Sequence, residues 1–127
     1  MIYLFLLFMI ITIYCNDGQN QIPDYRKKNM EHVLDFMYKF NLNRKEISVL
    51  DIGCDPTGYE ENLIAENAKF VVGINLKKYN KNFPEEAQKN AKENVRYVDM
   101  DATNLTFSNN TFDFIYILSI LSNILTT

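Results

Sequence analysis

Short apolar runs alternate with segments of helical pattern along most of the chain. Four of these runs, rich in β-branched or aromatic residues, are typical of strands in a parallel sheet: residues 47–52, 69–75, 95–99 and 112–117. Three segments repeat apolar side chains at helical spacing or begin with helix-start residues: residues 30–40, 59–67 and 84–93. This alternation predicts an α/β fold with a parallel sheet and right-handed crossovers.

The first apolar run, residues 2–14, stands ahead of this alternation. It is shorter than the roughly 20 residues that a helix needs to span a bilayer. Its length fits the apolar region of a signal peptide, although no clear cleavage site follows. Basic residues at 26–28 come after it, which favours a membrane-associated N-terminus with a cytosolic domain. Signal peptide, membrane anchor and buried helix all stay open for residues 1–15, and residues 16–28 are predicted as a polar linker.

Length and charge limit the classes of function. The chain has 127 residues, 47% hydrophobic and 23% charged, which suits one globular domain. The net charge is −3 and no basic face or arginine-rich run is present. Nucleic-acid binding through phosphate contacts is therefore not expected.

The cysteines and the single histidine offer little chemistry. Cys15 follows the apolar N-terminal run and Cys54 lies in the glycine loop, and two cysteines so placed do not make a disulfide framework. Cys54 lies beside a predicted helix start, which suits a reactive thiol, but a small buried residue is the favoured interpretation. His32 has no second ligand at i+4, so no metal site is predicted.

Polar residues follow each predicted strand at its carboxyl end. The strand at residues 47–52 runs into a glycine loop at residues 53–58 and then into a helix. Free backbone N–H groups in such a loop are expected to point at an anionic or nucleotide-like ligand. Asn75, Asp101 and Ser119 follow the next three strands. Because the carboxyl ends of parallel strands line one crevice, these residues predict a ligand site.

The motifs at these strand ends resemble those of class I S-adenosylmethionine-dependent methyltransferases, in the small-molecule branch. They are VLDIGC at residues 49–54, VGINL at 72–76, DATNLTF at 101–107 and NTFDFIY at 110–116. The resemblance covers residues 30 to 125. It implies a Rossmann-like three-layer sandwich over residues 29–127, with a partial doubly wound parallel sheet of about four of the family's seven strands.

The resemblance also implies S-adenosylmethionine as cofactor and assigns roles to matching residues. Gly53 and its loop would pass close to the methionine part, and Asp51 would order that loop and its amino-group contacts. Asn75 stands where the family has an acid bonded to the ribose. Asp101 would accept from the adenine amino group, and the Ala102 N–H would meet a ring nitrogen. The cofactor-binding residues implied are Asp51, Gly53, Cys54, Asp55, Gly58, Asn75, Leu76, Asp101, Ala102 and Ser119.

Three departures from the family pattern change the expectation. Asp55 replaces a glycine and would bring its charge near the cofactor carboxylate, while Asn75 replaces an acid. Each change is expected to weaken binding by about 1–2 kcal/mol, the scale of an impaired hydrogen bond. The chain also ends soon after the fourth predicted strand, without the part that supplies most substrate contacts. That strand is expected to form an exposed hydrophobic edge available to a protein partner.

Two functions remain open from the sequence. One is methyl transfer from S-adenosylmethionine to a small molecule or lipid, with no catalytic residue identified. The other is a non-catalytic methyltransferase-like module, secreted or membrane-associated, that acts through protein pairing. Sequons at Asn104 and Asn109 suit secretion or the endoplasmic reticulum lumen. The basic residues at 26–28 and the unpaired Cys54 favour the membrane-associated, cytosol-facing location, which is the one predicted.

Overall fold

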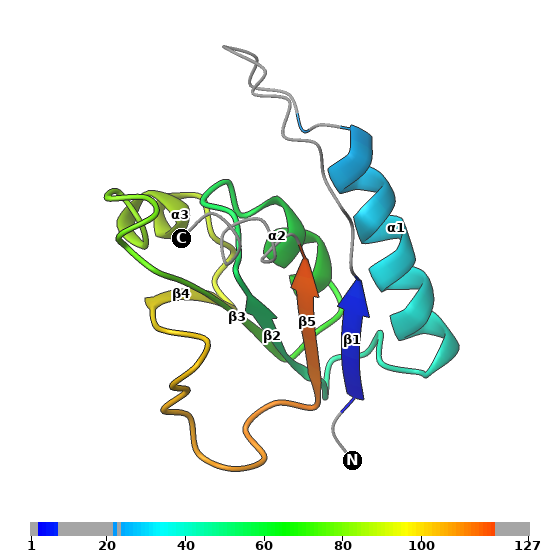
Figure 1. The fold of residues 1–127 in the computed structure, drawn as a ribbon. Coiled ribbons are helices and arrows are strands. Elements are labelled where there is room, and N and C mark those ends of the chain that lie inside the picture. Colours follow the sequence, from blue (N-terminus) through cyan, green and yellow to red (C-terminus); the bar gives the residue numbers. More distant parts are fainter. Residues whose placement is uncertain (1–2, 8–21, 23, 119–127) are drawn as a thin grey trace.

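A parallel five-stranded sheet forms the centre of the computed structural model, which describes residues 3–7, 22 and 24–118 (Figure 1). The strands are β1 (Tyr3–Leu7), β2 (Ser48–Ile52), β3 (Phe70–Asn75), β4 (Val95–Asp99) and β5 (Phe114–Leu118). The helices are α1 (Asp24–Lys39), α2 (Tyr59–Ala65) and α3 (Glu85–Lys89). The strand order is β1-β5-β2-β3-β4 and all pairs are parallel, so the predicted α/β fold is confirmed.

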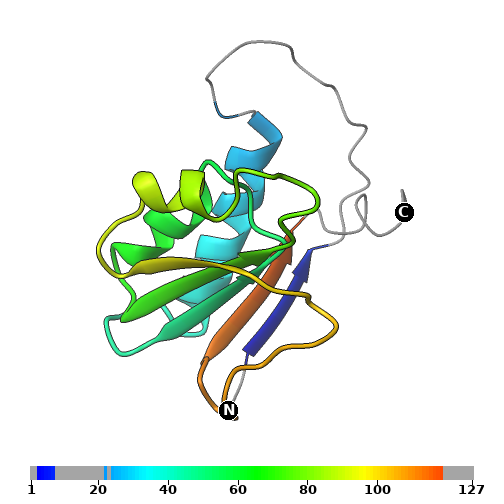
Figure 2. The same ribbon diagram turned by 90° about the vertical axis from the view of Figure 1, so that its left-hand side faces the viewer.

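One face of the sheet packs against all three helices, which Figure 2 shows on the same side. The buried stripe of α1 and apolar residues of α2 and α3 join the inward-facing strand residues in one core cluster. Its fully buried members include Val33, Val49, Val71, Ala87, Val95 and Phe114. Alternate strand residues thus supply one continuous core, as the two-residue period of a strand requires.

The opposite face packs against the long loop between β4 and β5. Leu50, Val72 and Ile74 are buried there, and Met100, Ala102 and Phe107 of the loop pack on the same cluster. The rings of Phe107 and Phe112 meet edge to face, with centroids 4.9 Å apart. None of the described helices belongs to this second cluster. Within the described residues, a loop therefore takes the place of a helical layer on this face.

The start of β5 is bound to the start of β2 by a reciprocal contact. The Ser48 N–H donates to Asp113 Oδ2, and the Asp113 N–H donates to the Ser48 carbonyl, both at 2.9 Å. Asp113 belongs to the NTFDFIY motif at residues 110–116 and comes directly before β5. Its role in the structure is to fix the register in which β5 enters the sheet.

The N-terminal segment differs most from the sequence-based expectation. Residues 3–7, expected within a signal peptide or anchor, form β1, which pairs with β5 from Tyr3 opposite Phe114 to Leu7 opposite Leu118. The prediction that β5 is an exposed edge is therefore wrong. An unpaired strand leaves a row of N–H and C=O groups open, and a second apolar strand can satisfy them. Residues 8–15, with Cys15, lie outside the described residues.

Helix boundaries differ in smaller ways. α1 begins at Asp24, inside the predicted linker, so Tyr25 and Arg26 belong to the helix. α3 spans five residues and ends at Lys89 rather than near residue 93. None of the helices described has the length and apolar character needed to cross a bilayer.

Candidate functional site

The loop after β2 turns sharply through two glycines. Gly53 has φ 81° and Gly58 has φ 72°, values in the left-handed region that other residues adopt at a steric cost. The N–H groups of Gly53 and Cys54 both donate to the Ile74 carbonyl on β3, at 2.9 and 3.0 Å. The first part of the loop is thus fastened to the neighbouring strand.

Asp55 organises the second part of the loop. Its Oδ1 accepts from the Thr57 N–H at 2.8 Å, and its carbonyl accepts from the Gly58 N–H at 3.3 Å. The backbone N–H groups of Gly53, Cys54, Thr57 and Gly58 are therefore all used inside the protein. For these four groups the expectation that free N–H groups point at a ligand is wrong, because each has an acceptor within the protein.

Packing alone requires a glycine at position 58. A Cβ at this position would lie 2.6 Å from Tyr97 Oη, too close for any real contact. The same hydroxyl donates to Glu61 Oε2 at 3.1 Å. Gly73 has a similar role, since a Cβ there would lie 2.9 Å from Cys54 Sγ. These glycines let Tyr97 and Cys54 pack against the backbone.

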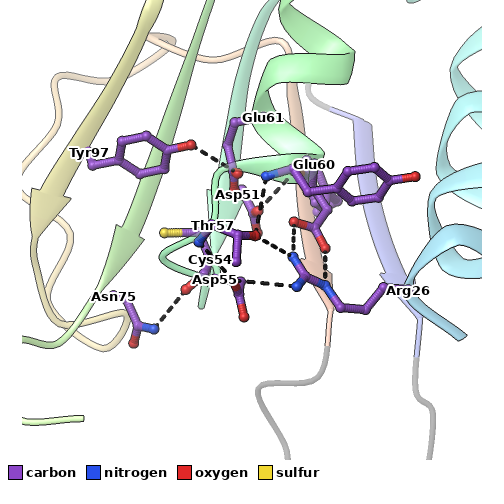
Figure 3. A network of polar contacts seen from close by, with 11 residues as sticks. Arg26, Asp51, Cys54, Asp55, Thr57, Glu60, Glu61, Asn75 and Tyr97 are labelled. Atoms are coloured by element: carbon purple, nitrogen blue, oxygen red, sulfur yellow. Dashed lines mark hydrogen bonds and ion pairs between the residues drawn. The ribbon is translucent and has the colours of Figure 1, made fainter. Parts of the chain in front are cut away.

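Arg26 of α1 reaches the glycine loop and the start of α2 (Figure 3). Its Nε and Nη2 donate to the two Glu60 carboxylate oxygens at 2.8 and 2.6 Å. Nη2 also donates to Thr57 Oγ1 at 3.1 Å, and Nη1 lies 3.4 Å from Asp55 Oδ1. The Asp55 charge, which the sequence leaves uncompensated, therefore has a counter-charge in the structure.

Two buried carboxyl groups lie behind the loop. Asp51 is 3% exposed and accepts from Tyr116 Oη at 2.9 Å, while Glu61 is fully buried. Burial raises the pKa of Asp51 to about 6, and burial together with the Asp51 charge raises the pKa of Glu61 well above its usual range. Glu61 Oε1 has no hydrogen-bond donor among the described residues. Both carboxyl groups therefore keep their protons to a higher pH than exposed carboxyl groups do.

Cys54 is a structural residue. Its side chain is 2% exposed, and burial with the nearby Glu61 charge raises the pKa of its thiol above the usual range. A thiol that stays protonated is a poor nucleophile. The interpretation of Cys54 as a small buried residue is confirmed.

Asn75 ties the end of β3 to the glycine loop. Its Nδ2 donates to the Cys54 carbonyl at 2.8 Å, and its Oδ1 accepts from the Leu76 N–H at 2.8 Å. A carboxylate at this position could not make the first bond, because it has no N–H to donate. Asn75 thus makes a contact that the acid expected from the family resemblance could not make.

Asp101 and Ala102 lie beyond β4. Asp101 is exposed and its Oδ1 accepts from both the N–H and the hydroxyl of Thr103, each at 2.8 Å. These bonds lower the pKa of Asp101, which keeps its carboxylate ionised and able to accept from a ligand. Ala102 packs on the second core cluster.

A pocket of about 350 Å³ opens at the carboxyl ends of β2 and β3, next to the first turns of α1. Five predicted site residues line it: Asp51, Gly53, Cys54, Asp55 and Asn75. Gly58, Leu76, Asp101 and Ala102 do not line this pocket, and Ser119 lies outside the described residues. Within the described residues, no group of His, Cys, Asp or Glu side chains is arranged to hold a metal ion.

Sequence reasoning missed the other lining residues: Tyr25, Arg26, Asn29, Pro56, Glu60, Tyr79, Asn80 and Leu118. A signal for the α1 residues was present in the chain. Arg26 and Asn29 continue the buried stripe of Met30, Val33 and Met37 toward the helix N-terminus at helical spacing. A polar end on an otherwise apolar stripe indicates where a helix leaves the core and meets a pocket.

Comparison with known proteins gives a family and a fold. The family model described as "Methyltransferase domain" matches residues 50–126. The crystal structure of YcgJ from Bacillus subtilis is similar at 30% identity and a TM-score of 0.54, over 68% of this chain and 37% of that one. A magnesium protoporphyrin IX methyltransferase (ChlM) from Synechocystis PCC 6803, solved with bound SAH, is similar at 18% identity and a TM-score of 0.57.

That second match covers 82% of this chain and 50% of the other. This chain therefore spans half or less of the length of these two solved proteins. No curated protein sequence matches it significantly. The Rossmann-like fold predicted from the sequence is confirmed by both structures.

Proposed function

Since this chain belongs to the methyltransferase-domain family, we propose that it binds S-adenosylmethionine in the pocket beyond β2 and β3 and transfers a methyl group to a small molecule or lipid. The observation that carries the proposal is the place of the pocket. It lies at the carboxyl ends of parallel strands, beside the glycine loop, where open α/β sheets bind ligands. Its volume, about 350 Å³, is in the range of small-molecule sites.

The charges that line the pocket fit this cofactor. Asp51, Asp55 and Glu60 bring carboxylates, and Arg26 brings one guanidinium. The balance is negative, which attracts a ligand that carries more positive than negative groups. S-adenosylmethionine has a sulfonium and an ammonium against a single carboxylate. The charged groups that line the pocket therefore support a cationic ligand of this class over a nucleotide phosphate.

The chain would contribute binding and orientation. When bound, the cofactor supplies a methyl group on a sulfonium, which is already electrophilic. Tyr25 and Tyr79, 39% and 42% exposed, line the same pocket and offer aromatic faces to a cation or an acceptor. The described carboxylates of the pocket are held by Arg26 or by Tyr116, so we assign no general base. Positioning of the acceptor would supply the rate enhancement.

The adenine end of the cofactor would extend toward β4. The Met100 N–H donates to the Asn75 carbonyl at 3.0 Å, which joins the two strand ends one residue before Asp101. We propose that the ionised Asp101 carboxylate accepts from the adenine amino group. Leu76 and Ala102 would flank that end, as the family resemblance implies.

Calorimetry on the full chain tests the proposal. Wild type is expected to bind S-adenosylmethionine, and Asp101→Ala is expected to weaken binding severalfold through loss of the adenine contact. Asp35→Ala, an exposed acid on α1, serves as the matched control and should bind like wild type. Absence of binding heat at millimolar cofactor, on a sample that circular dichroism proves folded, would refute the proposed function.

A non-catalytic cofactor-binding module is the second candidate. The observation that favours it is Asn75, whose amide is used by the Cys54 carbonyl and the Leu76 N–H rather than left for a ribose. Incubation with radiolabelled S-adenosylmethionine and fractionated small-molecule and lipid extracts separates the two. Binding without transfer in any fraction would favour the module.

A further inference from the structure

Asn29 of α1 carries a buried polar atom without a partner. Its side chain is 2% exposed and it lines the pocket, yet no group in the described part of the chain donates to its Oδ1. Buried acceptors left unpaired are rare in folded proteins, because each loses its hydrogen bonds to water. The sequence analysis assigned Asn29 no role. Because Asn29 lines the pocket, a ligand bound there is the natural source of the missing donor.

The neighbouring groups do not supply that donor. The guanidinium of Arg26, three residues earlier on the same helix, directs its N–H groups to Glu60, Thr57 and Asp55. Asp51 and Glu60 also line the pocket, but ionised carboxylates only accept. The lining residues Tyr25, Tyr79 and Asn80 also carry donors, but none of them bonds to Asn29 Oδ1. The unpaired amide oxygen thus shares the cavity with carboxylates, which are acceptors too. This set matches an ammonium group, which has three donors and a positive charge.

We propose that Asn29 is a cofactor-binding residue whose Oδ1 accepts a hydrogen bond from the α-ammonium group of S-adenosylmethionine, beside the Asp51 carboxylate. The inference rests on the proposed function and extends it, since it places the amino-acid end of the cofactor under α1. It also gives a reason why a polar residue continues the buried stripe of that helix. The guanidinium of Arg26, on the same side of the pocket, would face the carboxylate end of the same ligand.

Two ligands separate this contact from a general effect on the pocket. S-adenosylhomocysteine carries the ammonium, and methylthioadenosine keeps the adenosine but has no amino-acid part. Calorimetry on the full chain would compare both ligands with wild type, Asn29→Leu and Asn29→Asp. Asn43→Asp adds the same charge at an exposed position between α1 and β2 and is the matched control.

The expected pattern is specific. Asn29→Leu should weaken S-adenosylhomocysteine binding about tenfold, the effect of one charge-assisted hydrogen bond. Asn29→Asp should bind it as tightly as wild type or more tightly, because a carboxylate is a better acceptor for an ammonium. Both variants should bind methylthioadenosine like wild type, which also shows that they are folded. Asn43→Asp should change neither affinity.

Several results would overturn the inference. Unchanged S-adenosylhomocysteine binding by Asn29→Leu would exclude the contact. Equal weakening of both ligands would mean that Asn29 acts by holding the pocket together. Weaker S-adenosylhomocysteine binding by Asn29→Asp than by Asn29→Leu would indicate a contact with the ligand carboxylate through Nδ2 instead. If wild type binds neither ligand, the proposed function fails and the inference fails with it.

Discussion

The Arg26 guanidinium holds the Glu60 carboxylate through two N–H donors, at 2.8 and 2.6 Å, across 34 positions of sequence. The side chains are only 12% and 7% exposed, so this pair differs from an ordinary surface ion pair. It joins the start of α1 to the start of α2, and through Asp55 it also holds the glycine loop. The geometry of the candidate pocket therefore depends on a residue of the N-terminal helix.

Loss of this pair should destabilise the fold. Arg26→Met is expected to lower the free energy of unfolding by about 2–4 kcal/mol, because it leaves the Glu60 carboxylate partly buried without a partner. Arg26→Lys keeps the positive charge and should recover part of this loss. Recovery should be incomplete, because an ammonium cannot make the two-donor contact. Lys27→Met, at the exposed neighbouring position, should stay within about 0.5 kcal/mol of wild type. Urea unfolding measures all three, and equal effects at both positions would contradict the role of Arg26.

Asp55 offers a test of the glycine loop. Asp55→Gly removes a side chain and a negative charge, and it also frees Arg26 Nη1 for the cofactor carboxylate. Cofactor binding should tighten severalfold. Stability should fall by about 1 kcal/mol, because the hydrogen bond to the Thr57 N–H is lost. Asp55→Asn keeps that bond and should tighten binding without the loss. Weaker binding by both variants in calorimetry would show that the loop charge is needed.

The Asp51 and Glu61 pair should make stability depend on pH. Because the folded pKa of Asp51 is raised from 3.8 to about 6 and that of Glu61 is raised too, the folded chain holds protons that the unfolded chain releases. Stability should therefore fall as pH rises through about 4 to 6 and somewhat beyond. Thermal or urea unfolding at several pH values across that range measures this decrease in the free energy of unfolding.

Glu61→Gln should reduce this dependence. The amide keeps an acceptor for Tyr97 Oη and carries no charge at any pH, like the protonated acid. At pH near 8 the variant should be more stable than wild type, because it does not have to hold a buried carboxylate charge. Glu31→Gln, on the exposed face of α1, should leave the pH profile unchanged. Parallel profiles for wild type and Glu61→Gln would rule out a contribution of Glu61 to the pH dependence.

The N-terminal strand should protect β5. Deletion of residues 1–7 removes the strand that pairs with Phe114 to Leu118 and leaves β5 as an open apolar edge. The truncated chain should be less stable and should self-associate, as measured by urea unfolding and light scattering. Deletion of residues 1–2 alone leaves β1 in place and is the control. A monomeric truncated chain of unchanged stability would exclude a structural role for β1.

The location of the domain stays a prediction from the sequence. We expect a membrane-associated protein whose domain faces the cytosol, with neither sequon glycosylated. Asn104 and Asn109 are both exposed, so a domain in the lumen would present them to the glycosylation machinery. A mobility shift on glycosidase treatment in cells, abolished by Asn104→Gln and Asn109→Gln, would place the domain in the lumen.

The sequence by itself determined the alternation of strands and helices and the position of the glycine loop. These features are local, because an apolar β-branched run favours a strand and a glycine permits φ values such as the 81° at Gly53. β4 has the predicted bounds, and the other core strands agree within about two residues. Five of the predicted site residues line the pocket for the same reason, since they follow directly from where the strands end.

Only the tertiary structure decided which distant residues meet. Arg26 lies among the basic residues of an apparent membrane flank in the sequence, and only the packing of α1 on the sheet brings it to Glu60. Asn29 reaches the pocket by the same packing. The apolar run at the N-terminus suits a helix, a strand or a membrane segment equally well. Residues Tyr3–Leu7 form a strand because they pair with the open edge of β5, more than 100 residues away along the chain. A strand needs hydrogen-bond partners on a neighbouring strand, and the sequence of the strand alone does not show which neighbour it has.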